Sequence, residues 1–120
     1  MPTTACKRLR QVYKSYGLLY VVARENDSFE QIAADLGLKV KHLLKYNEVP
    51  EDFPLQKGDV VYLEKKKSKA DKPYYDHVVQ IGESMHSISQ RYGMRMKNLY
   101  KLNKRPFDYI PEEGDVLKLR

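Results

Sequence analysis

Hydrophobic residues in the first half of the chain recur with two different periods. Residues 19–22 form a short apolar run rich in β-branched and aromatic side chains, which predicts a strand. Apolar residues are then spaced by three and four along 29–36 and again along 40–47, which predicts two helices. A second apolar run at 60–63 predicts a closing strand. The predicted order is strand, helix, helix, strand.

The same pattern occurs a second time. A shift of 56 residues aligns residues 27–63 with residues 83–119 without a gap, and 13 of the 37 aligned positions are identical. Most of the identities fall at apolar, Gly, Pro and Asn positions, where structure restricts the choice of residue. Because we place the opening strand of the second copy at 77–79, we expect the turn after that strand to be one residue longer in the first copy.

Residues typical of helix starts and helix ends occur at equivalent positions in the two copies. Ser28 and Gln31 have the spacing of a capping box, in which the hydroxyl accepts a first-turn N–H. Ser84 provides the same cap in the second copy, but we expect Ser87 not to complete the box. A glycine follows the first helix of each copy, at the position where a left-handed residue ends a helix: Gly37 and Gly93.

The duplication predicts an α+β fold of two units, 18–64 and 76–120. Each unit has a two-stranded antiparallel sheet with two helices packed on one face. Residues 65–75 are rich in lysine and predict a flexible linker, which would raise avidity if both units engage one polymer. Residues 1–17 are interpreted as an N-terminal tail or the remnant of an upstream domain. Three of the side chains in and next to it could pack on the first unit: Tyr13, Tyr16 and Leu18.

Taken together, these motifs resemble the LysM domain. In the first unit they are Tyr20-x-Val22, Asp27-Ser28-Phe29, Ile32-Ala33, Gly37, Leu43-Leu44-x-Tyr46-Asn47 and Leu55-x-x-Gly58-Asp59-x-Val61-x-Leu63; in the second they are Val79, Gly82-Glu83-Ser84, Ile88, Tyr92-Gly93, Leu99-Tyr100-x-Leu102-Asn103 and Gly114-Asp115-x-Leu117-x-Leu119. The resemblance implies two βααβ units that bind N-acetylglucosamine in peptidoglycan or chitin. Tandem units of this kind are similar to the C-terminal wall-binding part of a bacterial glucosaminidase or other peptidoglycan hydrolase.

The resemblance also implies where the sugar binds. In the family, the ligand lies between the loop after the first strand and the loop before the last strand. In the first unit the implied glycan-binding residues are Asn26, Asp27, Ser28, Asn47, Val49, Pro50 and Phe53, with Phe29 beside them. In the second unit they are Gly82, Glu83, Ser84, Asn103, Arg105, Pro106 and Tyr109, with Met85 beside them.

Each of these residue types also has a structural interpretation. The two serines serve equally as helix caps, and the two asparagines can tie down the loop that follows them. Phe29 and Met85 suit a hydrophobic core. Three aromatic residues in the Pro-containing loops have less core to enter and are the stronger candidates for binding: Phe53, Phe107 and Tyr109. We expect the first unit, with its longer loop, to be the one that binds less well.

Net charge of +6 and a pI of about 9.3 favour anionic partners, which include wall polymers and nucleic acid. Nucleic-acid binding is therefore the alternative function, supported by the Lys run and ten tyrosines but by no recognised motif. Cys6 is the single cysteine, so no intramolecular disulfide forms. The absence of a disulfide framework favours bacterial peptidoglycan over chitin as the glycan.

Catalytic and metal-binding motifs are absent from the sequence. His42, His77 and His86 lack metal-ligand spacing, and no cofactor-binding motif occurs. We therefore expect a non-enzymatic monomer without cofactor or metal, or the non-catalytic fragment of a larger wall hydrolase. No apolar run is long enough to span a membrane, and the N-terminus has no signal-peptide h-region. If exported, the protein is expected in the cell envelope, in the periplasm or cell wall.

Overall fold

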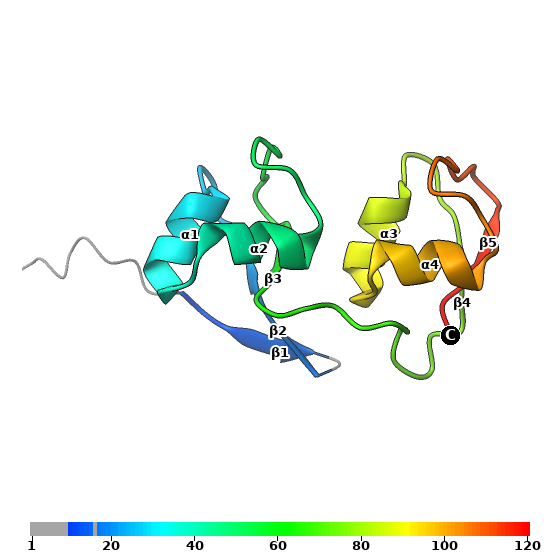
Figure 1. Cartoon of the computed structure of the whole chain (residues 1–120), viewed down its shortest axis with the longest axis horizontal. Helices are drawn as coiled ribbons and strands as arrows, with labels where there is room; N and C mark the ends of the chain where they lie inside the picture. Colours follow the sequence, from blue (N-terminus) through cyan, green and yellow to red (C-terminus); the bar gives the residue numbers. More distant parts are fainter. Residues whose placement is uncertain (1–9, 16) are drawn as a thin grey trace, which may run out of the picture. The chain divides into compact units, whose positions relative to one another are not determined.

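A computed structural model describes residues 10–15 and 17–120 of the chain. The chain divides into two compact units, with the boundary between Lys65 and Lys66. Each unit has its own sheet, its own pair of helices and its own hydrophobic core (Figure 1).

The described part of unit 1 contains five elements. They are β1 (Tyr13–Ser15), β2 (Leu18–Val22), α1 (Phe29–Leu36), α2 (Val40–Asn47) and β3 (Val60–Tyr62). The sheet is antiparallel throughout, with the order β1-β2-β3. The helices bury the inner face of β2 and β3, and the core consists of Val21, Phe29, Ile32, Ala33, Leu43 and Val61. Because apolar residues recur every three or four positions in both helices, each helix has an apolar face that packs on the sheet.

Unit 2 repeats this arrangement with four elements among the described residues. They are β4 (Asp76–Val78), α3 (Met85–Tyr92), α4 (Met96–Leu102) and β5 (Val116–Lys118). β4 and β5 pair antiparallel. The core consists of Ala70, Val79, Met85, Ile88, Met94, Leu99, Leu117 and Leu119. The predicted α+β fold with two strand–helix–helix–strand units is confirmed, but the sheet of unit 1 has three strands where two were predicted, because β1 pairs with β2.

The helix ends follow the predicted chemistry except in the two capping boxes. Ser28 accepts a hydrogen bond from the N–H of Gln31 at 3.1 Å, but the Gln31 side chain donates to Asp35 Oδ1 at 2.8 Å and does not complete the box. The expectation that Ser87 would not complete a capping box is wrong: its hydroxyl accepts the N–H of Ser84 at 2.9 Å while its own N–H donates to the Ser84 hydroxyl at 3.0 Å. A serine side chain is long enough to reach back across one turn, so the box does not require Glu or Gln.

The strand register corrects the predicted difference in loop length. Val22 pairs with Val60 in unit 1, and Val78 pairs with Val116 in unit 2, so the shift of 56 residues holds through the opening strands. No extra residue is inserted in unit 1. Asn26 has φ 65° and Gly82 has φ 83°, so an asparagine adopts in unit 1 the left-handed conformation that glycine adopts in unit 2.

The segment in front of unit 1 belongs to that unit where it is described. β1 extends the sheet, and Tyr13 stacks on Tyr20 with ring centroids 5.3 Å apart. Leu18 is buried, as the sequence suggested. The predicted contact of Tyr16, and the tail prediction for residues 1–9, lie outside the described residues.

The structure differs from the flexible linker expected at 65–75. Lys66 is only 1% exposed, and its ammonium group donates to Ser89 Oγ at 3.1 Å and to Gln90 Oε1 at 2.7 Å. The Lys67 N–H donates to the Gly93 carbonyl at 2.8 Å, and the N–H of the buried Ala70 donates to Leu119 at 2.9 Å. Lysine buries its aliphatic stem easily when its charged end finds acceptors, which a run of lysines in a sequence does not reveal.

Candidate functional site

In each unit, two loops lie at the same end of the sheet (Figure 1). In unit 1 they are the loop after β2 and the loop before β3, and in unit 2 they are the loop after β4 and the loop before β5. The Ala23 N–H donates to the Asp59 carbonyl at 2.8 Å, and the Gly58 N–H donates back to Ala23 at 2.9 Å. Val79 makes the equivalent pair with Asp115 and Gly114 at 2.8 and 2.9 Å. In each unit, backbone hydrogen bonds therefore join the start of the first loop to the turn that precedes the last strand.

The first loop of unit 1 is closed by a buried carboxylate. Asp27 Oδ2 accepts the N–H of Arg24 at 2.7 Å, and the Arg10 guanidinium binds both carboxylate oxygens at 2.7 and 2.9 Å. Arg10 also donates to Asp35 at 2.8 Å. The side chains of Arg10 and Asp27 are 2% and 0% exposed. Hydrogen bonding to Asp27 raises the pKa of Arg10 still further, so this cation stays charged at any working pH.

Asn47, at the start of the second loop of unit 1, is held by hydrogen bonds to the backbone. Asn47 is 1% exposed; its amide nitrogen donates to the carbonyls of Leu43 and Tyr62 at 2.8 and 2.9 Å, and its oxygen accepts the Tyr62 N–H at 2.7 Å. Val49 and Phe53 pack against the core, and Pro50 is exposed. These contacts favour the structural interpretation of Asn47.

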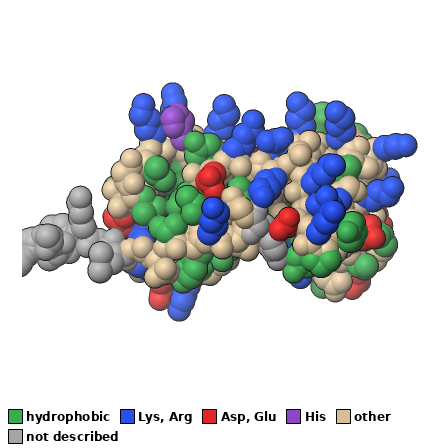
Figure 2. Space-filling model, turned by 90° about the horizontal axis from the view of Figure 1, so that it is seen from below, with side chains coloured by type: hydrophobic (Ala, Val, Ile, Leu, Met, Phe, Trp, Pro, Cys, Tyr) green, Lys and Arg blue, Asp and Glu red, His purple; other side chains and the backbone are tan. Residues whose placement is uncertain are grey.

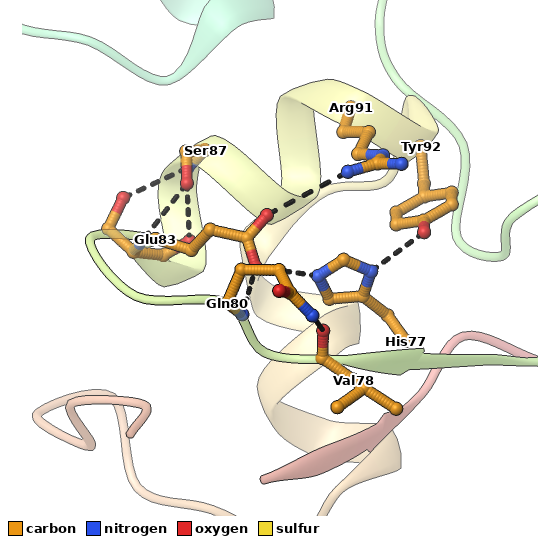
Figure 3. Close-up of polar contacts among 8 residues, drawn as sticks. His77, Val78, Gln80, Glu83, Ser87, Arg91 and Tyr92 are labelled. Carbon is orange, nitrogen blue, oxygen red and sulfur yellow. Dashed lines mark hydrogen bonds and ion pairs between the residues drawn. The ribbon is translucent and has the colours of Figure 1, made fainter. Parts of the chain in front are cut away.

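The first loop of unit 2 is closed by Glu83 in the same way, but with different partners (Figure 3). Glu83 Oε1 accepts the Gln80 N–H at 2.7 Å and lies 2.8 Å from His77 Nε2, while Oε2 lies 3.9 Å from Arg91. The other ring nitrogen of His77 is 2.8 Å from the Tyr92 hydroxyl.

Electrostatics in this cluster follow from its burial and its hydrogen bonds. Burial alone would raise the pKa of the Glu83 carboxyl, but the bonds from the Gln80 N–H and from His77 outweigh it, so the pKa of Glu83 is lowered. Burial raises the pKa of the Tyr92 phenol. Glu83 is therefore an anion in the neutral range, and Tyr92 keeps its proton.

The second loop of unit 2 has an aromatic residue at its base. The Arg105 guanidinium lies 4.6 Å from the centre of the Tyr109 ring, and the Tyr109 hydroxyl donates to Asp115. Burial raises the pKa of Tyr109, and the bond from Tyr109 lowers the pKa of Asp115. Asn103 donates to Lys118 at 3.0 Å and accepts its N–H at 2.6 Å, as Asn47 does with Tyr62.

Several of the implied site residues therefore have side chains engaged by the protein itself. The two serines cap helices, the two acids close loops, the two asparagines hold the last strand, and Phe29 and Met85 are core residues, as their structural interpretation suggested. Phe53 packs against the core of unit 1 and Tyr109 against the core of unit 2, so the expectation that these two aromatics have less core to enter is wrong. Asn26, Pro50, Gly82, Arg105 and Pro106 are exposed and can reach a ligand.

Three exposed apolar side chains mark the loops of unit 2. Ile81 is 82% exposed, Phe107 is 86% exposed and Ile110 is 80% exposed. Phe107 was a candidate from the sequence, but Ile81 and Ile110 were not. Their signal was an apolar residue beside the turn residues Gly82 and Pro111, where polar residues are the rule. At the equivalent positions unit 1 has Glu25, Glu51 and Pro54.

The described residues contain no group of three or more His, Cys, Asp or Glu side chains arranged to hold a metal ion. Within the same residues, no helix has the length and apolar character needed to cross a membrane. Lysine and arginine side chains are exposed on the face that Figure 2 shows. Two exposed lysines lie on the second helix of each unit: Lys41 and Lys45 on α2, and Lys97 and Lys101 on α4.

Comparison with known proteins gives one family. The LysM domain family matches residues 20–63 and 77–120. The crystal structure of the Bacillus cereus spore cortex-lytic enzyme SleL is similar with a TM-score of 0.37 and 24% identity, over 86% of this chain and 22% of that one. The Bacillus megaterium QM B1551 spore cortex-lytic enzyme SleL gives 0.34 and 15%, over 82% and 21%. The chain thus spans about a fifth of the length of these structures, and no curated protein matches it.

Proposed function

Because this chain belongs to the LysM domain family, we propose that it is a pair of non-catalytic modules that binds N-acetylglucosamine-containing glycan, with bacterial peptidoglycan as the first target. LysM domains bind peptidoglycan and related N-acetylglucosamine glycans. Both matched ranges are domains of this one binding family.

The observation that carries the proposal is the pair of exposed loops in unit 2. An N-acetyl sugar offers an acetamido group for hydrogen bonds, a methyl group and the apolar faces of its ring. Gly82 leaves loop backbone accessible, while Ile81, Phe107 and Ile110 present apolar surface that has no core to enter. Exposed apolar surface of this kind is typical of a site that binds a partner. Unit 2 is therefore the stronger binder, and unit 1 binds more weakly because its equivalent side chains are acidic or small.

The implied site residues divide into two roles under this proposal. The exposed ones contact the glycan: Asn26, Pro50, Gly82, Arg105 and Pro106, joined by Ile81, Phe107 and Ile110. The engaged ones hold the loops in shape: Asp27, Ser28, Asn47, Val49, Phe53, Glu83, Ser84, Asn103 and Tyr109. Such preorganisation lowers the entropy lost when a shallow site binds.

The same proposal places the protein in the cell envelope, where its two modules hold a polypeptide on the wall. Catalysis by this chain is not part of it. The paired acids Glu51-Asp52 and Glu112-Glu113 are exposed in turns, without the burial that a general acid needs to hold its proton. Membership of a larger wall hydrolase fits the architecture of tandem LysM units.

A second candidate is binding of an anionic polymer through charge alone. The exposed lysines on α2 and α4 favour it, and nucleic acid is the clearest case. Salt separates the two candidates, because counterion release makes purely electrostatic binding fall steeply with ionic strength.

The test is retention of the full chain on insoluble peptidoglycan and on chitin, at low and high salt, with soluble N-acetylglucosamine oligomers as competitor. Retention at high salt that the oligomers release supports the proposal. A Phe107→Ser/Ile110→Ser variant should lose about tenfold or more in affinity, since each large exposed apolar side chain contributes about 1 kcal/mol or more when covered. The matched control is Glu51→Ser in unit 1. Binding that disappears with salt and ignores the oligomers contradicts the proposal.

A further inference from the structure

Both units close the first loop with one carboxylate. Asp27 accepts the N–H of Arg24, and Glu83 accepts the N–H of Gln80, each at 2.7 Å and each three residues back along the chain. The carboxylate stands directly between the left-handed residue and the serine that caps the helix. The backbone that the proposed glycan contacts therefore keeps its shape only while this carboxylate stays in place.

The cations that hold the two carboxylates differ in chemistry. In unit 1, Arg10 binds Asp27 through two hydrogen bonds and reaches Asp35 with a third. In unit 2, the shift of 56 residues puts Arg91 at the position of Asp35, and His77 takes the place of the core residue Val21. A guanidinium keeps its charge at any working pH, whereas an imidazole changes charge between about pH 5 and 8.

The groups around His77 are few. Its side chain is 6% exposed, and its two ring nitrogens lie 2.8 Å from Glu83 Oε1 and from the Tyr92 hydroxyl (Figure 3). Arg91 lies beyond Glu83, and the Tyr74 ring lies 5.7 Å from that of Tyr92. Across the sheet, the partner of His77 is the apolar Leu117. Among the described residues, Glu83 is thus the charged group that contacts the imidazole directly.

Both charge states of His77 satisfy this geometry, but they do not hold Glu83 equally well. The neutral ring donates to one partner and accepts from the other, with the Tyr92 hydroxyl turning to suit. The imidazolium donates to both, and its bond to the Glu83 carboxylate then joins two opposite charges. Such charge-assisted hydrogen bonds are roughly twice as strong as neutral ones.

We propose that His77 is a positioning residue for the glycan-binding loop of unit 2, and that its protonation tightens glycan binding there, while Arg10 makes binding by unit 1 indifferent to pH. The inference rests on the proposed function of the two units. Affinity of unit 2 is highest where His77 is charged and Glu83 is ionised, and it falls as the pH rises and His77 loses its proton.

The test is an NMR titration of the full chain with a neutral N-acetylglucosamine tetramer, at steps from about pH 5.5 to about pH 8. Amide signals of residues 26–28 report unit 1, and those of residues 82–84 report unit 2, in one sample. Unit 2 should bind about two- to fivefold more weakly at the upper end, and the affinity of unit 1 should stay constant. A neutral ligand removes the effect of overall protein charge.

Variants separate positioning from mere stability. His77→Gln keeps a donor and an acceptor without a titrating charge, and it should flatten the pH profile of unit 2 while binding persists. Glu83→Gln should flatten the same profile by removing the other charge, which keeps the test decisive if His77→Gln does not fold. His86→Gln, at the second histidine of unit 2, is the matched control and should leave the pH profile as it is.

The outcomes are distinct. Tetramer binding by unit 2 that is constant with pH, or a pH profile that survives in both His77→Gln and Glu83→Gln, overturns the role of His77 and leaves the proposed function intact. A lack of shifts in either loop at every pH overturns the proposed function, and this inference with it.

Discussion

Unit 1 and unit 2 share one backbone and hold it with different side chains. Their strands pair in the same register, their first helices are capped by serine, and the same loop position is left-handed in both. The closing carboxylate is bound by Arg10 in unit 1 and by His77 in unit 2. Arg10 lies outside the range that matches the LysM family, and His77 lies inside it.

The two units therefore share the backbone geometry of the loop but not the side chains that hold the loop in that geometry. Any cation near the loop carboxylate can neutralise it, whereas the turn itself tolerates only residues that adopt positive φ. It follows that unit 1 depends on a segment beyond the domain boundary, and that unit 2 carries its own support.

The largest effect is expected from Arg10→Ala. This change leaves Asp27 and Asp35, whose side chains are 0% and 4% exposed, without their shared cation. Removing one partner of a buried ion pair typically costs about 3–5 kcal/mol, so unit 1 should lose most of its stability. Hydrogen exchange resolved by residue should show unit 1 opening while unit 2 is unchanged. Lys14→Ala, at an exposed position of β1, is the control.

Equal hydrogen exchange in the two units of the Arg10→Ala variant would show that unit 1 does not depend on Arg10. In that case the family boundary at residue 20 would also be the physical boundary of the module.

A smaller loss of stability is expected from Asn47→Ala, and a still smaller one from Asn103→Ala. Both asparagines bond to the N–H and the carbonyl of a last-strand residue, but Tyr62 is buried and Lys118 is exposed. Asn47→Ala leaves those backbone groups buried without partners and should cost about 2–4 kcal/mol, whereas water replaces the lost bonds in Asn103→Ala, which should cost about 1 kcal/mol. Urea unfolding of each variant measures the two costs, and equal costs would mean that burial at Tyr62 does not matter.

Acid should affect unit 2 through Glu83. Since the pKa of Glu83 is lowered in the folded state from its ordinary value of 4.5, its contribution is present above that value and is lost as the pH falls through the lowered pKa. The expected loss is about 1.5–3 kcal/mol, the contribution of a hydrogen bond to a charged group. Thermal unfolding followed from neutral to acid pH should show it, and Glu83→Gln should remove it. An unchanged acid transition in that variant would assign the loss to other carboxylates.

The smallest effect tests whether the two loops are equivalent. Asn26→Gly should change the stability of unit 1 by less than about 0.5 kcal/mol, because both residues adopt positive φ. Gly82→Ala should cost about 1 kcal/mol, since φ is 83° and a Cβ there meets nothing within 4 Å, so the cost is conformational alone. Thermal melts compare the two variants, and a large loss in Asn26→Gly would mean that its side chain has a structural contact.

The residues of the proposed binding surface could be named only in part from the sequence. The resemblance implied a pair of loops, which stays a prediction, and Phe107 was identified as an aromatic with no core to enter. Ile81 and Ile110 were missed because an apolar residue in a turn has no period that distinguishes an exposed side chain from a buried one. The engagement of Asp27 was missed because its partner, Arg10, lies 17 residues away along the chain.

What the sequence by itself determined is the duplication, the order of the elements, the serine caps and the glycine ends of the helices. All of these follow from local rules that act within a few residues, or from a comparison of the chain with itself. Tertiary structure alone decided that Arg10 and His77 hold the loops, that Lys66 is buried, and that β1 joins the sheet. Those contacts depend on which distant side chains meet in space, and a charged residue in a sequence looks the same whether it faces water or a buried carboxylate.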